Sequence, residues 1–567
     1  MSLNAFVDAF HAHRTSNPNA RVQLGVPGAL GELPDPSLIA ADARARSARE
    51  LLGQLASIPR DPLGFDEQLD LDLAKLMLEA ESFDLSYELN GKSTLSQLPR
   101  AGDDIGDGIF MLSVADPRPA AERLEDITSR IERTPEYLQR LLERLERPVA
   151  RWQQMDVAKV SELPTLLGSM ESWAHAERWS GAERLARANA AARAALADYE
   201  RRLREMPTTP DLHVGVAVAE RIVALRGIEQ SLDELHAMAR TFLAETDREL
   251  EALRERLVDK YGLSAETTRA ELHRFLNQRF RVKIPPGRLD QVLVRYRQEH
   301  ARVTAFIREH DLFPIPEEQD LQILETPGFM RPSIPAGAMT PPAPFRAGTA
   351  TSLIFLTLSE ELLDEHTELT IPVMMIHEGV PGHHLQLATA SKHPSLIRRH
   401  VMANDHAEGW TTMLEDYMLD RGYLEALADE ARFCAKRELN RIGARVAIDL
   451  FFMTGERDYL DVGLGIERGQ PDPFDAAGEL LAVVTGFTPG RVQAELNWYS
   501  LERGYPLSYL TGNQLVARLR RDMHAARAAD LSSERIDRLF FERYLRSGNM
   551  PLSFLRRVLR REGLITH

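Results

Sequence analysis

The sequence predicts a mainly α-helical protein, a large multi-helix body with a small β-sheet beside a helix pair rich in histidine and glutamate. Three observations support this class. Long stretches rich in Ala, Leu, Arg and Glu place apolar residues at helical spacing. Only one short run is apolar and β-branched enough to suggest a strand in the sheet. The chain has no fixed-period repeat, which argues against a solenoid.

The first 325 residues are expected to form helices that wall a cleft. The clearest helix is predicted over Thr134–Arg147, with Thr134 as its cap and Pro135 at its first position. Its leucines from 138 to 145 fall on one face, and Pro148 should end it because proline donates no N–H. Similar stretches cover about Glu177–Met206, Pro210–Lys260 and Gly287–Glu309.

The composition changes at Thr326–Thr351, where six prolines and several glycines preclude a long helix. This stretch is either a linker or a loop that borders a site. Ser352–Leu358 (SLIFLTL) follows as the predicted strand, and helical patterns resume at about Glu360. The predicted organisation is therefore a helical region 1–325, a Pro/Gly-rich loop 326–351, a region 352–520 that contains the histidine-rich segment, and C-terminal helices 521–567.

The charge balance argues against a nucleic-acid partner. Lys and Arg number 69 against 85 Asp and Glu, a formal net charge of −16, whereas phosphate binding needs clustered positive charge. The single cysteine, Cys434, excludes an internal disulfide and a cysteine-rich metal site. No apolar run reaches the ~18 residues of a membrane span, and the N-terminus lacks a signal-peptide core. We expect a cytoplasmic protein with no membrane partner; its oligomeric state stays open.

Ile371–Leu387 (IPVMMIHEGVPGHHLQL) predicts a metal site. In the zinc motif H-E-x-x-H, two histidines one helical turn apart bind the ion and the glutamate lies beside the bound water. Here His377 and Glu378 end an apolar helical run, and His383 and His384 follow within eight residues of His377. So many potential ligands in so short a stretch favour metal binding over a polar loop.

The spacing of these histidines requires a break in the helix. His383 is six residues after His377, about 240° around an ideal helix, and His384 is seven residues after it, about 10 Å along the axis. Neither pair could share an ion in a regular helix. Gly379–Gly382 has the composition of a tight loop, so we predict that it turns His383 toward the metal, with His384 as the alternative ligand.

A catalytic zinc site takes three protein ligands and leaves one position for water, so two imidazoles are not enough. The next acidic candidates lie in HAEGWTTMLEDYM, where Glu408 is 25 residues after His383. That distance allows a second helix to return past the metal. Glu408 and Glu415 are seven residues apart and share one helix face, so one can bind the metal while the other holds the free N–H of an imidazole.

These segments resemble a bacterial family known as domain of unknown function 885, whose signatures are HEGxPGHHLQ and an EGWxxxxE helix. The matching residues lie within about Arg346–Arg520. The family is grouped with zinc metallopeptidases of the thermolysin-like class. The resemblance therefore implies a metallopeptidase-like fold and one zinc ion per chain.

A more distant similarity implies a role for each ligand. The thimet oligopeptidase-type and Taq-type carboxypeptidase metallopeptidases carry H-E-x-G-H-A-L, which this sequence matches when two residues of HEGVPGHHL are removed. His377 and His383 then correspond to the first two ligands. EGWTTMLE implies Glu408 as the third ligand and Glu415 as the outer acid.

The same similarity extends to GYPLSYLTGN (Gly504–Asn513), which resembles the tyrosine-rich GYxxxYxLGN segment of the carboxypeptidases. It implies that Tyr505 and Tyr509 face the scissile carbonyl. The chain departs from the peptidases at Asn497, where they have a histidine that binds the oxyanion. An amide can donate a hydrogen bond but supplies no positive charge, which leaves the substrate class open.

A second departure lies on another helix. Relatives carry a histidine shortly after an Arg-x-x-x-Asp segment, whereas here Arg445 and Asp449 are followed by LFFM. Neither departure affects the predicted metal ligands.

The expected reaction is zinc-assisted hydrolysis of a short peptide or small amide, with Glu378 as general base. Tyr505, Tyr509 and Asn497 are expected to donate hydrogen bonds to the oxyanion. The strand Ser352–Leu358 could pair with an extended substrate, although a buried strand of a small sheet is favoured for most of its residues. A zinc hydrolase of a non-peptide amide or ester is the alternative, followed by a non-catalytic metal- or peptide-binding relic.

Overall fold

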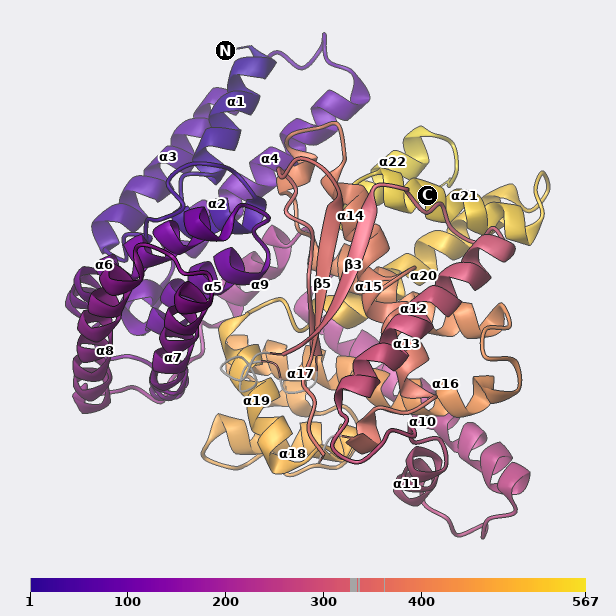
Figure 1. Ribbon diagram of the computed structural model, residues 1–567. Helices are drawn as coiled ribbons and strands as arrows, with labels where there is room; N and C mark the ends of the chain where they lie inside the picture. Colours follow the sequence, from indigo (N-terminus) through magenta and orange to yellow (C-terminus); the bar gives the residue numbers. More distant parts are fainter. Residues whose placement is uncertain (1, 327–333, 335–336, 361–362, 567) are drawn as a thin grey trace. The chain divides into compact units, whose positions relative to one another are not determined.

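The computed structural model describes residues 2–326, 334, 337–360 and 363–566 (Figure 1). It is mainly helical, with a three-stranded mixed sheet and a two-stranded antiparallel sheet, which confirms the predicted fold class. Within the described ranges, no helix combines the length and apolar character needed to cross a membrane. The chain divides into two compact units. The boundaries predicted at residues 325, 351 and 520 stay predictions.

The first unit comprises Met1–Val214 with the short segments Ala343–Ala347 and Ser395–His400. Its longer elements are α1 (Leu3–Arg14), α2 (Pro18–Leu24), α3 (Leu38–Ala56), α4 (Phe65–Asp84), β1 (Glu88–Leu89), β2 (Lys92–Ser93), α5 (Ala101–Val114), α6 (Ala120–Arg144), α7 (Ala150–Ala176) and α8 (Ala182–Glu205).

The helix predicted to begin at Thr134 begins fourteen residues earlier, so that prediction is wrong. Thr134 does not cap α6: its hydroxyl donates to the carbonyl of Arg130 inside the helix. The apolar stripe of α6 already starts at Leu124 and Ile127, both fully buried, and packing of that stripe carries the helix through Pro135. The predicted end is close, because α6 stops at Arg144.

The second unit comprises Gly215–Pro342, Gly348–Pro394 and Val401–His567. Its longer elements are α9 (Val216–Leu225), α10 (Leu232–Tyr261), α11 (Arg269–Arg279), α12 (Asp290–Glu309), β3 (Gln319–Glu325), β4 (Gly337–Thr340), β5 (Ala350–Leu356), α13 (Thr370–Glu378), α14 (His383–Ser391), α15 (Asn404–Asp420), α16 (Ala428–Leu439), α17 (Arg441–Thr454), α18 (Pro473–Thr485), α19 (Pro489–Leu501), α20 (Ser508–Arg527), α21 (Ser533–Arg546) and α22 (Leu552–Arg561).

The stretch Pro210–Lys260, predicted as helical, contains two helices. Arg226 and Gly227 end α9, and Gly227 adopts a positive φ of 80° that favours glycine. Ser231 then starts α10: its hydroxyl accepts from the Glu234 N–H while the Glu234 carboxylate accepts from the Ser231 N–H.

The small sheet has the order β3-β5-β4. β5 corresponds to the predicted strand and lies in the middle, parallel to β3 and antiparallel to β4; Figure 1 shows β3 and β5 side by side. Leu353–Leu356 therefore pair on both edges, which confirms a buried strand of a small sheet and leaves these residues no free edge for a substrate. The described part of Thr326–Thr351 contains β4 and no helix; residues 327–333 and 335–336 of that stretch lie outside the described residues.

Helices α12 and α13 pack on the sheet through one hydrophobic cluster. Tyr296 of α12 and Met375 of α13 are almost completely buried against Ile323 of β3 and Ile354 of β5. This cluster fixes α13, the helix that ends in the predicted metal-binding segment, on a rigid support.

Helices α15 and α20 approach each other closely at two glycines. A Cβ on Gly512 would lie 2.1 Å from the carbonyl oxygen of Asp405, and a Cβ on Gly409 would lie 2.5 Å from the carbonyl carbon of Gly512. No side chain larger than hydrogen fits at either position. Residues 405–415 of α15 are buried without interruption.

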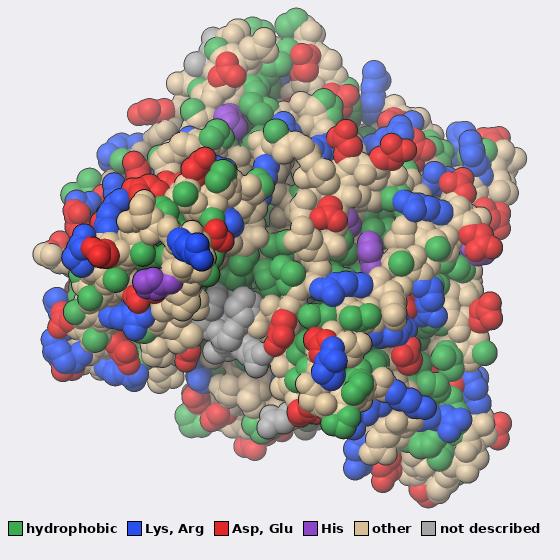
Figure 2. All heavy atoms as spheres, in the orientation of Figure 1, with side chains coloured by type: hydrophobic (Ala, Val, Ile, Leu, Met, Phe, Trp, Pro, Cys, Tyr) green, Lys and Arg blue, Asp and Glu red, His purple; other side chains and the backbone are tan. Residues whose placement is uncertain are grey.

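The charged residues are distributed as expected for solvated helix faces. On the face shown in Figure 2, Lys and Arg side chains are interspersed with Asp and Glu side chains. The abundant charges of the helical stretches thus cover the surface without forming one large patch of a single sign in that view.

We predict that Gly512→Ala destabilises the protein by about 1–3 kcal/mol, because the added methyl group must push α15 and α20 apart. Gly490→Ala in α19 is the matched control, since its Cβ would meet no atom within 4 Å. The control should be neutral or slightly stabilising, because alanine favours helix. Urea unfolding followed by circular dichroism compares the two, and equal stabilities would contradict the close packing.

Candidate metal centre

The helix break predicted at Gly379–Gly382 is confirmed. α13 ends at Glu378 and α14 begins at His383, with Gly379 and Gly382 at the two helix ends. A Cβ on Gly382 would lie 1.9 Å from the carbonyl oxygen of His377. The chain can therefore fold back directly onto the end of α13 only because residue 382 is a glycine.

Helix α15 holds this break in place through the residue that follows Gly409. The indole N–H of Trp410 donates to the carbonyl oxygen of Pro381 at 2.8 Å, and both residues are buried. The Trp410 ring packs in turn on Tyr544 of α21, with ring centroids 4.8 Å apart. Sequence reasoning missed this role of Trp410, although the residue stands inside the EGW motif.

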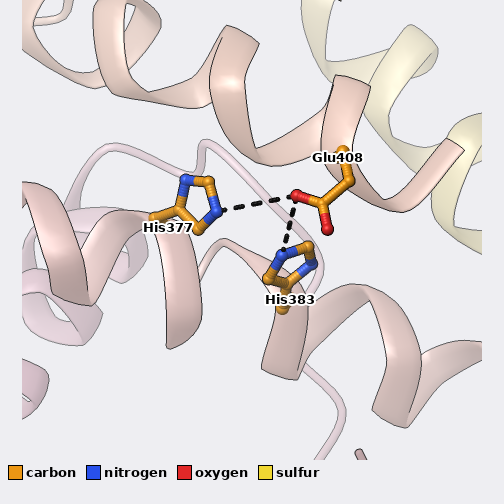
Figure 3. Close-up of side chains that lie close together, drawn as sticks. All are labelled: His377, His383 and Glu408. Atoms are coloured by element: carbon orange, nitrogen blue, oxygen red, sulfur yellow. Dashed lines mark ion pairs between the residues drawn. The ribbon is translucent and has the colours of Figure 1, made fainter. Parts of the chain in front are cut away.

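The break brings His377, His383 and Glu408 together (Figure 3). Their side chains come from the end of α13, the start of α14 and the first turns of α15, and they point toward one another. The Nε2 atoms of His377 and His383 lie 3.9 Å and 3.4 Å from Glu408 Oε2. The candidate ligand atoms all lie within 4.8 Å of one another.

His384, the alternative ligand, lies outside this cluster. Its Nδ1 shares a hydrogen bond of 2.7 Å with the hydroxyl of Ser352 on the central strand β5. Burial lowers the pKa of His384 to about 4, so the ring is neutral at neutral pH. His384 thus ties α14 to the sheet, and its neighbour His383 faces Glu408.

Glu415 contacts His377 on the side of the ring that faces away from Glu408, as the seven-residue spacing of the two glutamates on α15 allows. One carboxylate oxygen of Glu415 is 2.8 Å from His377 Nδ1, which leaves Nε2 to face Glu408. Burial lowers the pKa of His377, but the Glu415 hydrogen bond and the neighbouring carboxylates raise it to about 9. A carboxylate on the far nitrogen is the arrangement that orients histidine ligands in metal sites.

The buried carboxylate of Glu408 requires a positive partner. Burial raises its pKa, but interaction with the two histidines and the Tyr505 hydroxyl lowers it to about 2. Glu408 Oε2 is nonetheless buried without a hydrogen bond. A buried carboxylate is costly unless it is paired or binds a metal, and the nearest groups to Oε2 are the two imidazole nitrogens.

The geometry of the cluster fits a metal ion. Ligands about 2.0–2.1 Å from a tetrahedral ion stand about 3.3–3.4 Å apart. The separations from Glu408 Oε2 to the two imidazole nitrogens, 3.4 Å and 3.9 Å, are close to this value. His377, His383 and Glu408 could therefore hold an ion with little movement.

Glu378 is the last residue of α13 and follows His377 directly. It is only partly buried, and its negative charge is among the influences that raise the pKa of His377. The carboxylate is therefore close to the cluster while still accessible to solvent. Its predicted role as a base stays a prediction.

The two predicted tyrosines lie at the cluster. The hydroxyl of Tyr505 donates to Glu408 Oε1 at 3.0 Å, and the hydroxyls of Tyr505 and Tyr509 are 3.4 Å apart. Burial raises the pKa of both hydroxyls, so both stay protonated. The bond from Tyr505 to Glu408 was not predicted.

Asn497 is not joined to the cluster. Within the described residues, no hydrogen bond or ion pair links it to His377, His383 or Glu408. Asn497 lies on α19, and its side-chain oxygen is buried without a hydrogen bond. The predicted role of Asn497 as an oxyanion donor stays a prediction.

The family is shown by a match over nearly the whole chain. Residues 18–559 match the family described as "Bacterial protein of unknown function (DUF885)". The chain belongs to this family. The match extends far beyond the Arg346–Arg520 segment that carries the motifs and includes most of the first unit. No curated protein matches this DUF885 chain.

Two solved structures share the fold of the DUF885 chain. One is described as "a putative lipoprotein of unknown function from Shewanella oneidensis", with a TM-score of 0.76, 16% identity, and coverage of 99% of this chain and 100% of that one. The other is described as "the putative lipoprotein from Colwellia psychrerythraea", with a TM-score of 0.80, 15% identity, and coverage of 99% and 98%. Lipoproteins are anchored at the cell envelope, and these descriptions contradict the cytoplasmic location expected above.

We predict that Trp410→Phe destabilises the DUF885 chain by about 1–3 kcal/mol, because the buried Pro381 carbonyl loses its donor. The matched control is Trp173→Phe, which removes a 3.3 Å bond to the exposed Glu177. The control should change the free energy of unfolding by at most about 0.5 kcal/mol. Thermal unfolding measures both variants, and equal losses would exclude a special role of the Trp410 bond.

Proposed function

We propose that this chain is a zinc-dependent hydrolase that binds one zinc ion through His377, His383 and Glu408 and cleaves short peptides. The observation that carries the proposal is the convergence of two imidazole Nε2 atoms on one buried carboxylate oxygen that has no hydrogen bond. Two histidines and one glutamate form a ligand set of catalytic zinc sites, which leave a fourth position for water.

The surroundings of the cluster favour hydrolysis over a purely structural metal site. A structural zinc site is closed by four protein ligands, whereas three converge among the described residues. Glu378 adjoins the ligand His377 without belonging to the ligand set, as the base of an H-E motif does. Glu415 on His377 Nδ1 would keep that ring oriented.

A bound zinc ion would supply Lewis acidity toward a substrate carbonyl and would acidify water. Glu378 would take a proton from the attacking water on its carboxylate and deliver it to the leaving amine. Tyr505 holds Glu408 through its hydroxyl, and Tyr509 lies beside it. Tyr509 is therefore the better placed of the two to donate a hydrogen bond to the developing oxyanion.

The substrate class rests on the resemblance to metallopeptidases. An amide and an ester present the same carbonyl to these residues, so a non-peptide amide or ester hydrolase is the alternative. A panel of short peptides, with and without blocked termini, assayed beside simple esters separates the two classes.

We expect about one zinc ion per chain, and its loss in His377→Ala, His383→Ala and Glu408→Ala. His384→Ala is the matched control, because the His384 ring bonds to Ser352 and lies outside the cluster. Elemental analysis of dialysed protein measures the metal and also detects iron, which the same donor set can bind. Loss of zinc in His384→Ala with retention in His383→Ala would overturn the ligand assignment.

Glu378→Gln should retain zinc near the wild-type level while hydrolysis falls by about 10²–10⁴-fold, because the variant keeps its shape and loses its base. Glu408→Ala should lose zinc and hydrolysis together. Metal content and turnover of the best substrate of the panel are measured on the same preparations. Full activity of Glu378→Gln would exclude this mechanism, whatever its metal content.

A further inference from the structure

Helix α17 carries a buried arginine that binds the helix next to the tyrosines. Arg445 is 4% exposed. Its Nε donates to the hydroxyl of Tyr499 and its Nη2 to Glu495, both at 2.9 Å, and both acceptors lie on α19. The Tyr499 hydroxyl also donates to Glu495, so the three side chains form a closed set of bonds.

The same guanidinium group lies against aromatic rings that reach the metal centre. Its central carbon is 4.2 Å from the ring centroid of Tyr509 and 5.1 Å from that of Trp498. Trp498 packs edge-on against Tyr505, with centroids 4.9 Å apart and planes at 89°. One buried cation thus supports both tyrosines, directly at Tyr509 and through Trp498 at Tyr505.

One turn further along α17, Asp449 holds the backbone of the tyrosine segment. Its carboxylate accepts from the N–H groups of Gly504 and Leu507 at 3.2 Å and 3.1 Å. These two residues flank Tyr505. Asp449 therefore fixes the turn that precedes α20, while Arg445 fixes the ring positions.

We propose that Arg445 is a positioning residue for the reaction: with Glu495 it sets the place of the Tyr509 hydroxyl beside Tyr505 and Glu408. The inference rests on the proposed hydrolase function. Arg445 would act by holding Tyr509 in place, and it does not bind the metal, because the three candidate ligands lie on α13, α14 and α15. Two of the three guanidinium nitrogens of Arg445 are engaged by Tyr499 and Glu495, and Nη1 is buried without a hydrogen bond.

Arginine is required at this position for a geometric reason. A planar guanidinium can donate from Nε and Nη2 in one plane while its face lies on an aromatic ring. The ammonium group of lysine is a point charge without such a face, so Arg445→Lys keeps the charge and loses the geometry. The substitution therefore tests position separately from charge.

The test is a double-mutant cycle with Arg445→Lys, Tyr509→Phe and the double variant, assayed for kcat, KM and zinc content. Arg445→Lys should keep zinc and KM and lower kcat by about 10–100-fold, since a misplaced group near the reaction costs up to about 10²-fold. In the Tyr509→Phe background the same substitution should cost less than about 2-fold, because its target hydroxyl is already absent. Losses that multiply in full would overturn the inference.

The matched control is Arg520→Lys. Arg520 also pairs with a carboxylate, Asp537, at 2.7 Å and 2.8 Å and lies over the ring of Tyr417 at 5.2 Å. It shares this chemistry but none of the contacts to Tyr505 or Tyr509, so its kcat should stay within about 2-fold of wild type. If Arg445→Lys does not fold, Glu495→Gln replaces it, and the same pattern of kcat loss and coupling to Tyr509→Phe is expected.

A second measurement does not depend on hydrolysis. Protein labelled with 3-fluorotyrosine gives ¹⁹F resonances that Tyr505→Phe and Tyr509→Phe assign among the 12 tyrosines. Arg445→Lys should shift or broaden the Tyr509 resonance, and Arg520→Lys should leave it unchanged. If no substrate is hydrolysed but the resonance responds, the proposed function fails and the positioning role stands. If the chemical shift and line width of the Tyr509 resonance do not change in Arg445→Lys, the positioning role is overturned.

Discussion

Helix α15 can approach α20 closely only because Gly409 and Gly512 present no side chain to each other's backbone. That approach places Glu408 within 3.0 Å of the Tyr505 hydroxyl. Consecutive helical residues point about 100° apart, so Glu408, Gly409 and Trp410 face three different neighbours. Glu408 faces the histidines, Gly409 faces α20, and Trp410 bonds to Pro381. The three residues of the EGW motif therefore connect the histidine pair, helix α20 and the break between α13 and α14.

The second constraint is electrostatic. Glu378, Glu408 and Glu415 surround two imidazoles, and the charges of these carboxylates raise the pKa of His377 to about 9. Such an arrangement favours a cation in the centre, whether protons on the rings or a metal ion. Glu408 Oε2 has no hydrogen bond and faces the Nε2 atoms of both imidazoles, so it is the oxygen best placed to bind such a cation. The site thus combines a rigid backbone with a negative electrostatic environment that favours binding of a cation.

The aromatic side of the centre shows how a buried ion pair can serve geometry. Arg445 is buried and its partner Glu495 is mostly buried, and in such surroundings an ion pair contributes little net stability compared with apolar residues. Their hydrogen bonds and the rings around the guanidinium group nevertheless fix the orientation of the Tyr509 ring, which apolar packing alone would leave free to rotate. The Tyr509 side chain lies between the two groups: its ring contacts Arg445, and its hydroxyl is next to the Tyr505 hydroxyl at the candidate metal centre.

The sequence by itself determined the mainly helical class, the single strand after the Pro/Gly-rich stretch and the helix break at Gly379–Gly382. These features follow from local properties: apolar spacing, β-branching, and glycine and proline where a helix cannot continue. Local signals were insufficient at Thr134 and Pro135, because the buried stripe of α6 overrides a cap and a proline that would start a helix in isolation.

The tertiary structure gave the physical reason why His383, predicted as the ligand, joins Glu408 and the alternative His384 does not. His383 and His384 are equivalent in the sequence as potential ligands, and the hydrogen bond of His384 to Ser352 on β5 separates them. The same holds for the bond of Trp410 to Pro381 and for the central place of β5 in the sheet. The spacing of Glu415 from Glu408 already predicted that Glu415 holds an imidazole, and the fold decided that this imidazole is His377. Each depends on contacts between residues far apart in the chain, which no local pattern encodes.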